Sequence, residues 1–236
     1  PKDTSVQLLE RIAAGLTAAC SALAPGCGVV GGDLGTAPVV IAAVTALGDM
    51  QGRASVLRSG ASAGDTVAYA GSLGLSGIGL AMLFREAADA AGVAHSRGLR
   101  ELRERIPAAL TAQLAPRPPI GLGVIAAEAS ARAMMDVSDG LALDAARMAE
   151  ASAVTIDFDS VLLLDAYGVQ QGQAVSVAEM LTGGEDHGLL ATFARDAVLP
   201  NGFHRIGTVR GAVPDGSGVL LDGVPFQPRG WDPFAR

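Results

Sequence analysis

The chain has 236 residues, half of them hydrophobic, which is enough for one large domain or two small ones with a sizeable core. Its formal net charge of −7 argues against a nucleic-acid-binding surface, which needs a basic face, so we expect no nucleic-acid partner. An anionic substrate stays compatible with this charge, because a bound metal ion inverts the local sign.

The first fifty residues are predicted to form a helix followed by two strands. A short apolar pair, Val29 and Val30, leads into Gly31-Gly32-Asp33, and residues 38–47 have the pattern of a buried strand. The helix is indicated by apolar side chains that recur on one face, namely Leu8, Leu9, Ile12, Leu16, Cys20 and Leu23.

The cellular compartment is inferred from targeting signals and from the cysteine content. The start lacks the apolar core of a signal peptide, and no uninterrupted apolar run approaches the roughly 18 residues of a membrane span. The two cysteines, Cys20 and Cys27, are too few for a disulfide framework. We therefore expect a reduced cytoplasmic protein with no membrane partner. Because the chain enters a helix pattern directly after Pro1, we also expect an N-terminal portion to precede it.

A break rich in glycine and serine follows the first fifty residues. We place a domain boundary there, between residues 1–51 and 52–236. Beyond it, helices are predicted over residues 80–91, 99–114 (interrupted at Pro107), 122–133, 141–151 and 175–181. Strands are predicted over residues 66–70, 131–136, 154–158, 189–193 and 203–209, with a hairpin at 219–226.

The segment Asp136-Val-Ser-Asp-Gly140 lies between a predicted strand and a predicted helix. Ligands of α/β proteins bind at the carboxyl ends of strands, and a loop with two carboxylates and a hydroxyl suits Mg²⁺ shared with a phosphate. Alternatively, Asp139 or Ser138 caps the following helix and does nothing else. The loop alone leaves both interpretations open.

Four further features carry two interpretations each. Gly31-Gly32-Asp33 is either a turn or a phosphate and metal loop, and the glycines from Gly71 to Gly79 either bind an anion at a helix start or permit tight packing. Arg58 is either solvated or clamps a phosphate. Gly183-Gly-Glu-Asp186 is either a helix stop or a pair of functional carboxylates.

Lysine and tryptophan each occur once in the chain, and both bear on the class of reaction. The only lysine is Lys2, which excludes a P-loop, because that loop needs Gly-Lys-Ser/Thr, and equally excludes the strand lysine of protein kinases. The sole tryptophan, Trp231, either anchors the C-terminal tail or stacks on a planar substrate ring.

Taken in order, these motifs resemble those of thiamine-monophosphate kinases, a family within the superfamily of aminoimidazole ribonucleotide synthetase and selenophosphate synthetase. The resemblance covers nearly the whole chain. It rests on Val30-Gly-Gly-Asp33, Gly52-Arg-Ala-Ser-Val-Leu-Arg-Ser-Gly-Ala61, Asp136-Val-Ser-Asp-Gly140, Gly183-Gly-Glu-Asp186 and Gly230-Trp231.

The resemblance implies transfer of the γ-phosphate of ATP to thiamine monophosphate, giving thiamine diphosphate, with Mg²⁺ as cofactor. It also implies a homodimer and an α/β (α+β) fold: two lobes of the aminoimidazole ribonucleotide synthetase type, with mixed sheets and flanking helices. Residues 1–51 would be the C-terminal part of the ATP-binding and dimerisation lobe, and residues 52–236 the C-terminal lobe. The implied contacts are Gly32, Asp33, Arg58 and Ser138 to ATP, Asp33, Asp136 and Asp139 to Mg²⁺, and Glu185 and Trp231 to thiamine monophosphate.

The chain departs from the family's pattern in two places. It lacks the N-terminal Gly-Asp-Asp loop and a further acid that hold several of the Mg²⁺ ions. It also has His187-Gly188 where the family usually has Tyr-Glu. The first departure favours one alternative, a truncated, non-catalytic chain that only binds ligand. Another ATP-dependent synthetase of the superfamily is the second alternative.

Overall fold

The computed structural model describes residues 1–212 and 218–230 and divides the chain into two compact units, Pro1–Ser55 and Val56–Arg236. This division lies four residues beyond the boundary that the sequence predicts. The assignment of the first unit to an ATP-binding and dimerisation lobe stays a prediction.

The first unit contains one helix, α1 (Val6–Leu23), whose N-terminus is capped by the Ser5 side chain. All of its residues are described, and the strand predicted over residues 38–47 does not form in it. Apolar side chains of that segment are exposed, with Leu47 at 91% and Val44 at 75%. The prediction of a buried strand is wrong here because a strand must pair its backbone groups with a neighbour, and these 55 residues supply none.

Helix α1 is also relevant to the membrane prediction. By length and composition alone it could cross a membrane, and none of its residues is buried within the described structure. The core helix of a soluble protein passes the same test of length and composition. The expectation of no membrane partner therefore stays a prediction.

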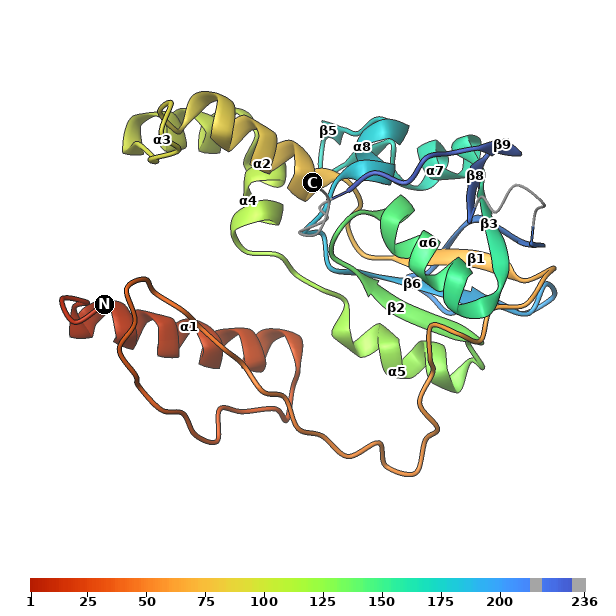
Figure 1. Cartoon of the computed structure of the whole chain (residues 1–236), viewed down its shortest axis with the longest axis horizontal. Helices are drawn as coiled ribbons and strands as arrows, with labels where there is room; N and C mark the ends of the chain where they lie inside the picture. Colours follow the sequence, from red (N-terminus) through yellow and green to blue (C-terminus); the bar gives the residue numbers. More distant parts are fainter. Residues whose placement is uncertain (213–217, 231–236) are drawn as a thin grey trace. The chain divides into compact units, whose positions relative to one another are not determined.

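A mixed sheet forms the centre of the second unit (Figure 1). Among the described residues its strand order is β2-β6-β1-β7-β3-β8-β9, and all neighbours are antiparallel except β3 and β8. The strands are β1 (Thr66–Ala70), β2 (Ala133–Val137), β3 (Val154–Phe158), β6 (Gly188–Phe193), β7 (His204–Gly211), β8 (Val219–Leu221) and β9 (Val224–Pro225). A separate pair, β4 (Val169–Gln170) and β5 (Gln173–Ala174), was not predicted.

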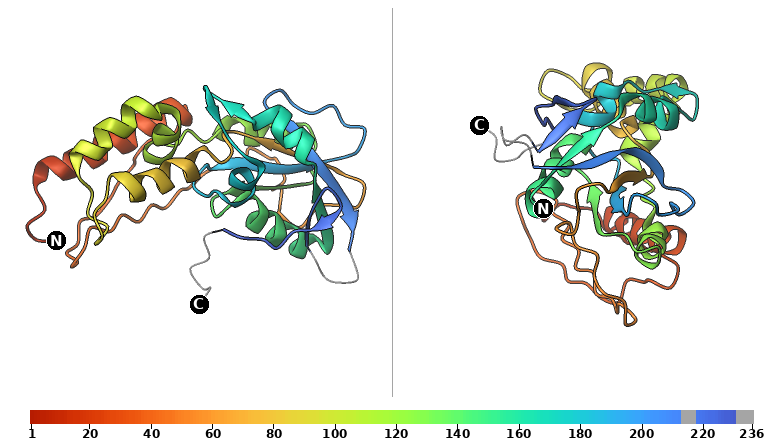
Figure 2. Two further views of the ribbon diagram at one scale, coloured as in Figure 1. Left: turned by 90° about the horizontal axis from the view of Figure 1, so that it is seen from above. Right: turned by 90° about the vertical axis from the view of Figure 1, so that its right-hand side faces the viewer.

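Alternation along β1 gives the sheet two apolar faces. Val67 and Tyr69 belong to the larger core cluster, whereas Ala68 and Ala70 belong to a second cluster on the opposite face. The larger core takes in α6 (Leu141–Ser152), α7 (Ser160–Tyr167) and α8 (Val177–Thr182), and the second core takes in α5 (Ile120–Glu128). Figure 2 shows these layers from two further sides. The predicted mixed α/β architecture with flanking helices is confirmed.

Three helices, α2 (Leu75–Glu86), α3 (Ser96–Arg105) and α4 (Pro107–Leu114), share a small core of their own around Leu102 and Leu110. The break that the sequence predicts at Pro107 separates α3 from α4. Helix α2, however, begins five residues earlier than predicted, inside the glycine-rich run, and α5 ends at Glu128 rather than at residue 133. The early start of α2 is explained by a residue from the candidate active site.

Candidate active site

The acidic loop lies where the sequence predicts, between the end of β2 at Val137 and the start of α6 at Leu141. Its side chains do not cap α6: the N-cap residue is Gly140, which makes no side-chain hydrogen bond. The interpretation in which Asp139 or Ser138 serves only as a cap is therefore wrong. Both side chains are half-buried and free of that role.

A buried carboxylate one turn into α6 holds this loop. Asp144 is 1% exposed, and its Oδ2 accepts the backbone N–H groups of Ser138 and Asp139, both at 3.0 Å. Arg147 Nη1 donates to Asp144 Oδ1 at 2.6 Å and to Asp139 Oδ2 at 2.5 Å. Burial raises the pKa of Asp144, while the Asp139 N–H and Arg147 act in the opposite direction. Sequence analysis missed Asp144 and Arg147, although both lie on the first turns of the helix that the loop begins.

The second acidic motif lies beside the first because β2 and β6 are antiparallel neighbours, so that the end of one meets the start of the other. Glu185 N–H donates to the Ser138 carbonyl at 2.7 Å, and His187 N–H donates to the Val137 carbonyl at 3.0 Å. A Cβ at Gly184 would lie 2.8 Å from the Ser138 carbonyl oxygen, so the absence of a side chain permits this close approach. Two motifs some 45 residues apart thereby form one site.

The backbone of the second motif is unusual on both sides of Asp186. Glu185 has φ +68° and His187 has φ +53°, so two residues with side chains adopt the left-handed conformation. Their side chains meet, with His187 Nε2 3.2 Å from Glu185 Oε2. Glu185 remains half-exposed at 51% of its side-chain area, which leaves its carboxylate accessible to a ligand.

Asp186 between them points the other way, into the protein. It is 4% exposed and accepts the N–H groups of Gly74 at 2.5 Å and Ser76 at 3.0 Å, so it caps the N-terminus of α2. This explains why α2 begins inside the glycine run: its cap comes from a residue 110 positions away. The interpretation of that run as an external anion site is wrong, because the protein's own carboxylate occupies the helix start.

Burial raises the pKa of Asp186 to about 6, against an ordinary value of 3.8, and outweighs the two N–H donors and His187. Between these values the folded protein binds a proton that the unfolded chain does not. The stability that this group contributes is therefore full below pH 3.8 and is lost as the pH rises through 6.

We expect Asp186→Asn, which carries no charge, to gain stability relative to the parent as the pH rises from 4 to 7. The two pKa values limit the gain to about 3 kcal/mol. Urea unfolding of both proteins across this range measures the difference. A difference that stays constant with pH would contradict the raised pKa.

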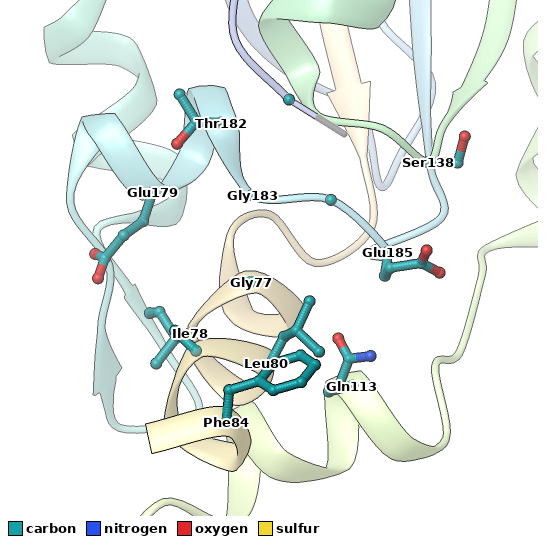
Figure 3. Close-up of a pocket in the computed structure, with 13 residues that line it drawn as sticks. Gly77, Ile78, Leu80, Phe84, Gln113, Ser138, Glu179, Thr182, Gly183 and Glu185 are labelled. Atoms are coloured by element: carbon teal, nitrogen blue, oxygen red, sulfur yellow. The ribbon is translucent and has the colours of Figure 1, made fainter. Parts of the chain in front are cut away.

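A cavity of about 690 Å³ opens beside the joined motifs. Ser138, Glu185 and Gln113 supply polar atoms to its lining, and Gly183, Gly184 and Gly230 bring backbone to it. The opposite wall is apolar and comes from α2, with Leu80 and Phe84 drawn beneath the Gly183–Glu185 segment in Figure 3. The cavity therefore joins an apolar surface to polar and acidic groups, which suits a ligand with a ring at one end and, where a cation offsets the carboxylates, a phosphate at the other.

Other predicted contacts lie elsewhere. The Arg58 carbonyl accepts from Ser152 Oγ at the C-terminal end of α6, so the 12-residue helix places it roughly 18 Å from the acidic loop. The second unit by itself does not bring Arg58 to the cavity. Gly32 and Asp33 belong to the first unit, where Asp33 Oδ1 accepts the Leu34 N–H at 2.8 Å. Trp231 lies outside the described residues.

The predicted metal ligands of the loop are Asp136, which is exposed, and Asp139, which is held by Arg147. Among the described residues, no three acidic, histidine or cysteine side chains gather closely enough to form a metal site. The donors of the loop nevertheless fit Mg²⁺, which proteins usually hold by one or two carboxylates together with water and substrate phosphates. The assignment of Asp33, Asp136 and Asp139 to Mg²⁺ stays a prediction.

Comparison with known proteins identifies the family, although no protein-family model matches the chain. The chain is 40% identical over 218 residues to thiamine-monophosphate kinase of Mycobacterium tuberculosis, which covers 89% of the chain and 59% of that relative. It is 32% identical over 240 residues to the Aquifex aeolicus enzyme of the same name, covering 99% of the chain and 71% of that relative.

The structure resembles that of AaThiL complexed with AMPPCP and TMP, with a TM-score of 0.57 and 31% identity over 76% of this chain and 54% of that one. The likeness confirms the expected fold of the aminoimidazole ribonucleotide synthetase type. The chain spans about 59% of the Mycobacterium relative it matches. It belongs to the thiamine-monophosphate kinase family.

Proposed function

We propose that the complete protein transfers the γ-phosphate of ATP to thiamine monophosphate and forms thiamine diphosphate. The observation that carries this proposal is the meeting of the Ser138–Asp139 loop and Glu185 at one cavity with an apolar wall. The related AaThiL structure was solved with AMPPCP and TMP, a nucleotide analogue and the phosphate acceptor that we propose.

In this proposal the two ends of the cavity have separate tasks. The apolar side chains of α2, among them Leu80 and Phe84, bury the rings of the acceptor. The Glu185 carboxylate, half-exposed beside them, attracts the positive charge of the thiazolium ring. Trp231 follows Gly230, which lines the cavity, and we propose that it contacts the same rings.

The phosphate end depends on positioning and charge neutralisation, which supply most of the catalysis in phosphoryl transfer. Mg²⁺ held there would offset the negative charge of the phosphates. Asp136 and Asp139 offer oxygen ligands from this loop, and Asp33 from the first unit. We propose ATP contacts from Gly32, Asp33, Arg58 and Ser138. These assignments make an enzyme without an active-site lysine chemically reasonable.

The test is the reaction itself, with the full-length protein. We expect thiamine diphosphate to form from thiamine monophosphate only when both ATP and Mg²⁺ are present, as resolved by chromatography of the products. A well-folded protein that forms none but uses ATP on another phosphate acceptor would keep the superfamily and reject the acceptor. Metal-dependent turnover by the 236 residues alone would show that they are not merely a ligand-binding fragment.

We also propose that the complete protein is a cytoplasmic homodimer. The exposed apolar segment of residues 39–47 supports an interface, because exposed apolar patches of this kind commonly mark one. We expect a dimeric mass in light scattering at tens of micromolar. A monomeric mass at that concentration would reject the dimer and leave the kinase proposal untouched.

A further inference from the structure

We infer that Asp144 is a positioning residue for the phosphate end of the site: its carboxylate holds the backbone of the 136–140 loop in the shape that presents Ser138 and Asp139 to ATP and Mg²⁺. This inference rests on the proposed function. It adds to the proposed ligands a residue that touches none of the reactants.

Asp144 cannot itself be a ligand, because both of its oxygens are engaged inside the protein. Oδ2 accepts two adjacent backbone N–H groups, those of Ser138 and Asp139, each at 3.0 Å. Oδ1 accepts from Arg147 at 2.6 Å, and the side chain is only 2% exposed. Burying a carboxylate costs desolvation free energy unless partners compensate the charge. The partners of Asp144 therefore indicate its role.

The two N–H groups that Asp144 holds belong to the residues predicted to bind ATP and metal. Gly140, the N-cap residue of α6, has φ +124° and no side chain to fix the turn, so the loop depends on support from elsewhere. Asp144 gives that support to the backbone, and Arg147 gives it to the Asp139 carboxylate through Oδ2. Within residues 1–212 and 218–230, the Asp139 carboxylate is bonded to Arg147 through Oδ2 and is 23% exposed, which leaves its other oxygen for a cation.

The same loop also supports the acceptor end of the cavity. The Ser138 carbonyl accepts the N–H of Glu185 at 2.7 Å, so a displacement of the loop would move the backbone of the second motif. The hydrogen bonds of Asp144 thus connect α6 to the proposed binding residues at both ends of the cavity. Partners behind metal ligands of this kind typically contribute 10- to 100-fold in metal affinity or activity.

Two substitutions separate the anchoring of the backbone from a simple charge balance with Arg147. Asp144→Asn keeps an oxygen that can accept both loop N–H groups but removes the negative charge and the oxygen that accepts from Arg147. Asp144→Ala removes both. If Asp144 anchors the loop, Asn should stay within about 5-fold of the parent in kcat/KM for Mg-ATP, whereas Ala should fall by roughly 10- to 100-fold.

Hydrogen exchange of the ligand-free proteins provides a readout that does not depend on activity. We expect the Ser138 and Asp139 amides to be protected in the parent and in Asp144→Asn, and to lose protection in Asp144→Ala. Asp159 offers a matched control, because its carboxylate likewise accepts two N–H groups, from Val161 and Leu162, at the start of α7. Asp159→Ala should lower stability by about 1 kcal/mol and leave kcat/KM for Mg-ATP unchanged.

Equal impairment by Asn and Ala would overturn the inference, because Asp144 would then act only as the counter-charge of Arg147. Parent-like exchange and kinetics in Asp144→Ala would overturn it as well. If the Ala variant does not fold, the Asn variant decides: retained protection and rate support the anchor, and their loss rejects it. A parent protein that makes no thiamine diphosphate would reject the proposed function, while the exchange result would still report on the anchor.

Discussion

Asp139→Asn is expected to lower the rate of thiamine diphosphate formation by about 100-fold or more, by analogy with other losses of charge stabilisation in a transition state. Asparagine keeps the shape of the side chain and an oxygen for Arg147, but it loses the charge that a cation needs. Stability should change little, because the Asp139–Arg147 pair is partly exposed, at 23% and 35% of side-chain area, and such pairs contribute at most about 1 kcal/mol.

The measurement pairs a Mg²⁺-dependent kinase assay with thermal unfolding of the ligand-free, full-length protein. We expect the melting temperature to fall by about 2–4 °C or less. Added ATP and Mg²⁺ should stabilise the variant less than the parent, since stabilisation by a ligand follows its affinity. Asp165→Asn, an acid-to-amide change at an exposed position of α7, is the control and should match the parent. An Asp139→Asn variant that works at the parent rate would remove Asp139 from the metal site.

Gly188→Ala is expected to destabilise the second unit by about 3 kcal/mol, at the upper end of the usual cost of overpacking. Gly188 begins β6, and a Cβ there would collide with the hydroxyl of Tyr69 and lie 2.6 Å from the Ala70 carbonyl oxygen. Tyr69 is fully buried, and its hydroxyl donates to the Ser72 carbonyl at 2.7 Å, so it has no free space to move into. The glycine that departs from the family's pattern is therefore required by its neighbour.

Urea unfolding would show this effect as a lower transition midpoint with an unchanged slope. Gly211→Ala provides the matched control, because Gly211 also lies in a strand of the sheet but has open space where a Cβ would be built. An unchanged midpoint in Gly188→Ala would show that Tyr69 yields without cost.

Local patterns were sufficient for much of the second unit. The apolar run at residues 66–70 predicts a strand, which forms with those bounds. The change between strand and helix patterns predicts the acidic loop, which forms, although β2 runs one residue further than predicted, to Val137. The start of α2 could not be predicted, because Gly74 offers no capping side chain and the cap comes from Asp186, far along the chain. The strand prediction for residues 38–47 is wrong although the local pattern is strong. The pattern favours a strand, but this part of the chain holds no partner strand.

The candidate site divides in the same way. Ser138, Asp139 and Glu185 lie in motifs that the sequence singles out, and the family resemblance implies their roles, but their meeting depends on the pairing of β2 with β6, which no local pattern encodes. Asp144 was overlooked because an acid in the first turn of a helix is ordinary in a sequence. Only its burial and its two loop N–H partners distinguish it from a solvated residue.

The left-handed backbone at Glu185 has a consequence for engineering this protein. A residue with a side chain costs of order 1 kcal/mol or more in that conformation, and glycine avoids the cost. A selection for thermal tolerance alone would therefore favour Glu185→Gly, while the same change would delete the carboxylate that faces the cavity. At position 185, thermal stability and catalytic activity therefore favour different residues. A screen that measures only one of these properties will select a variant that loses the other.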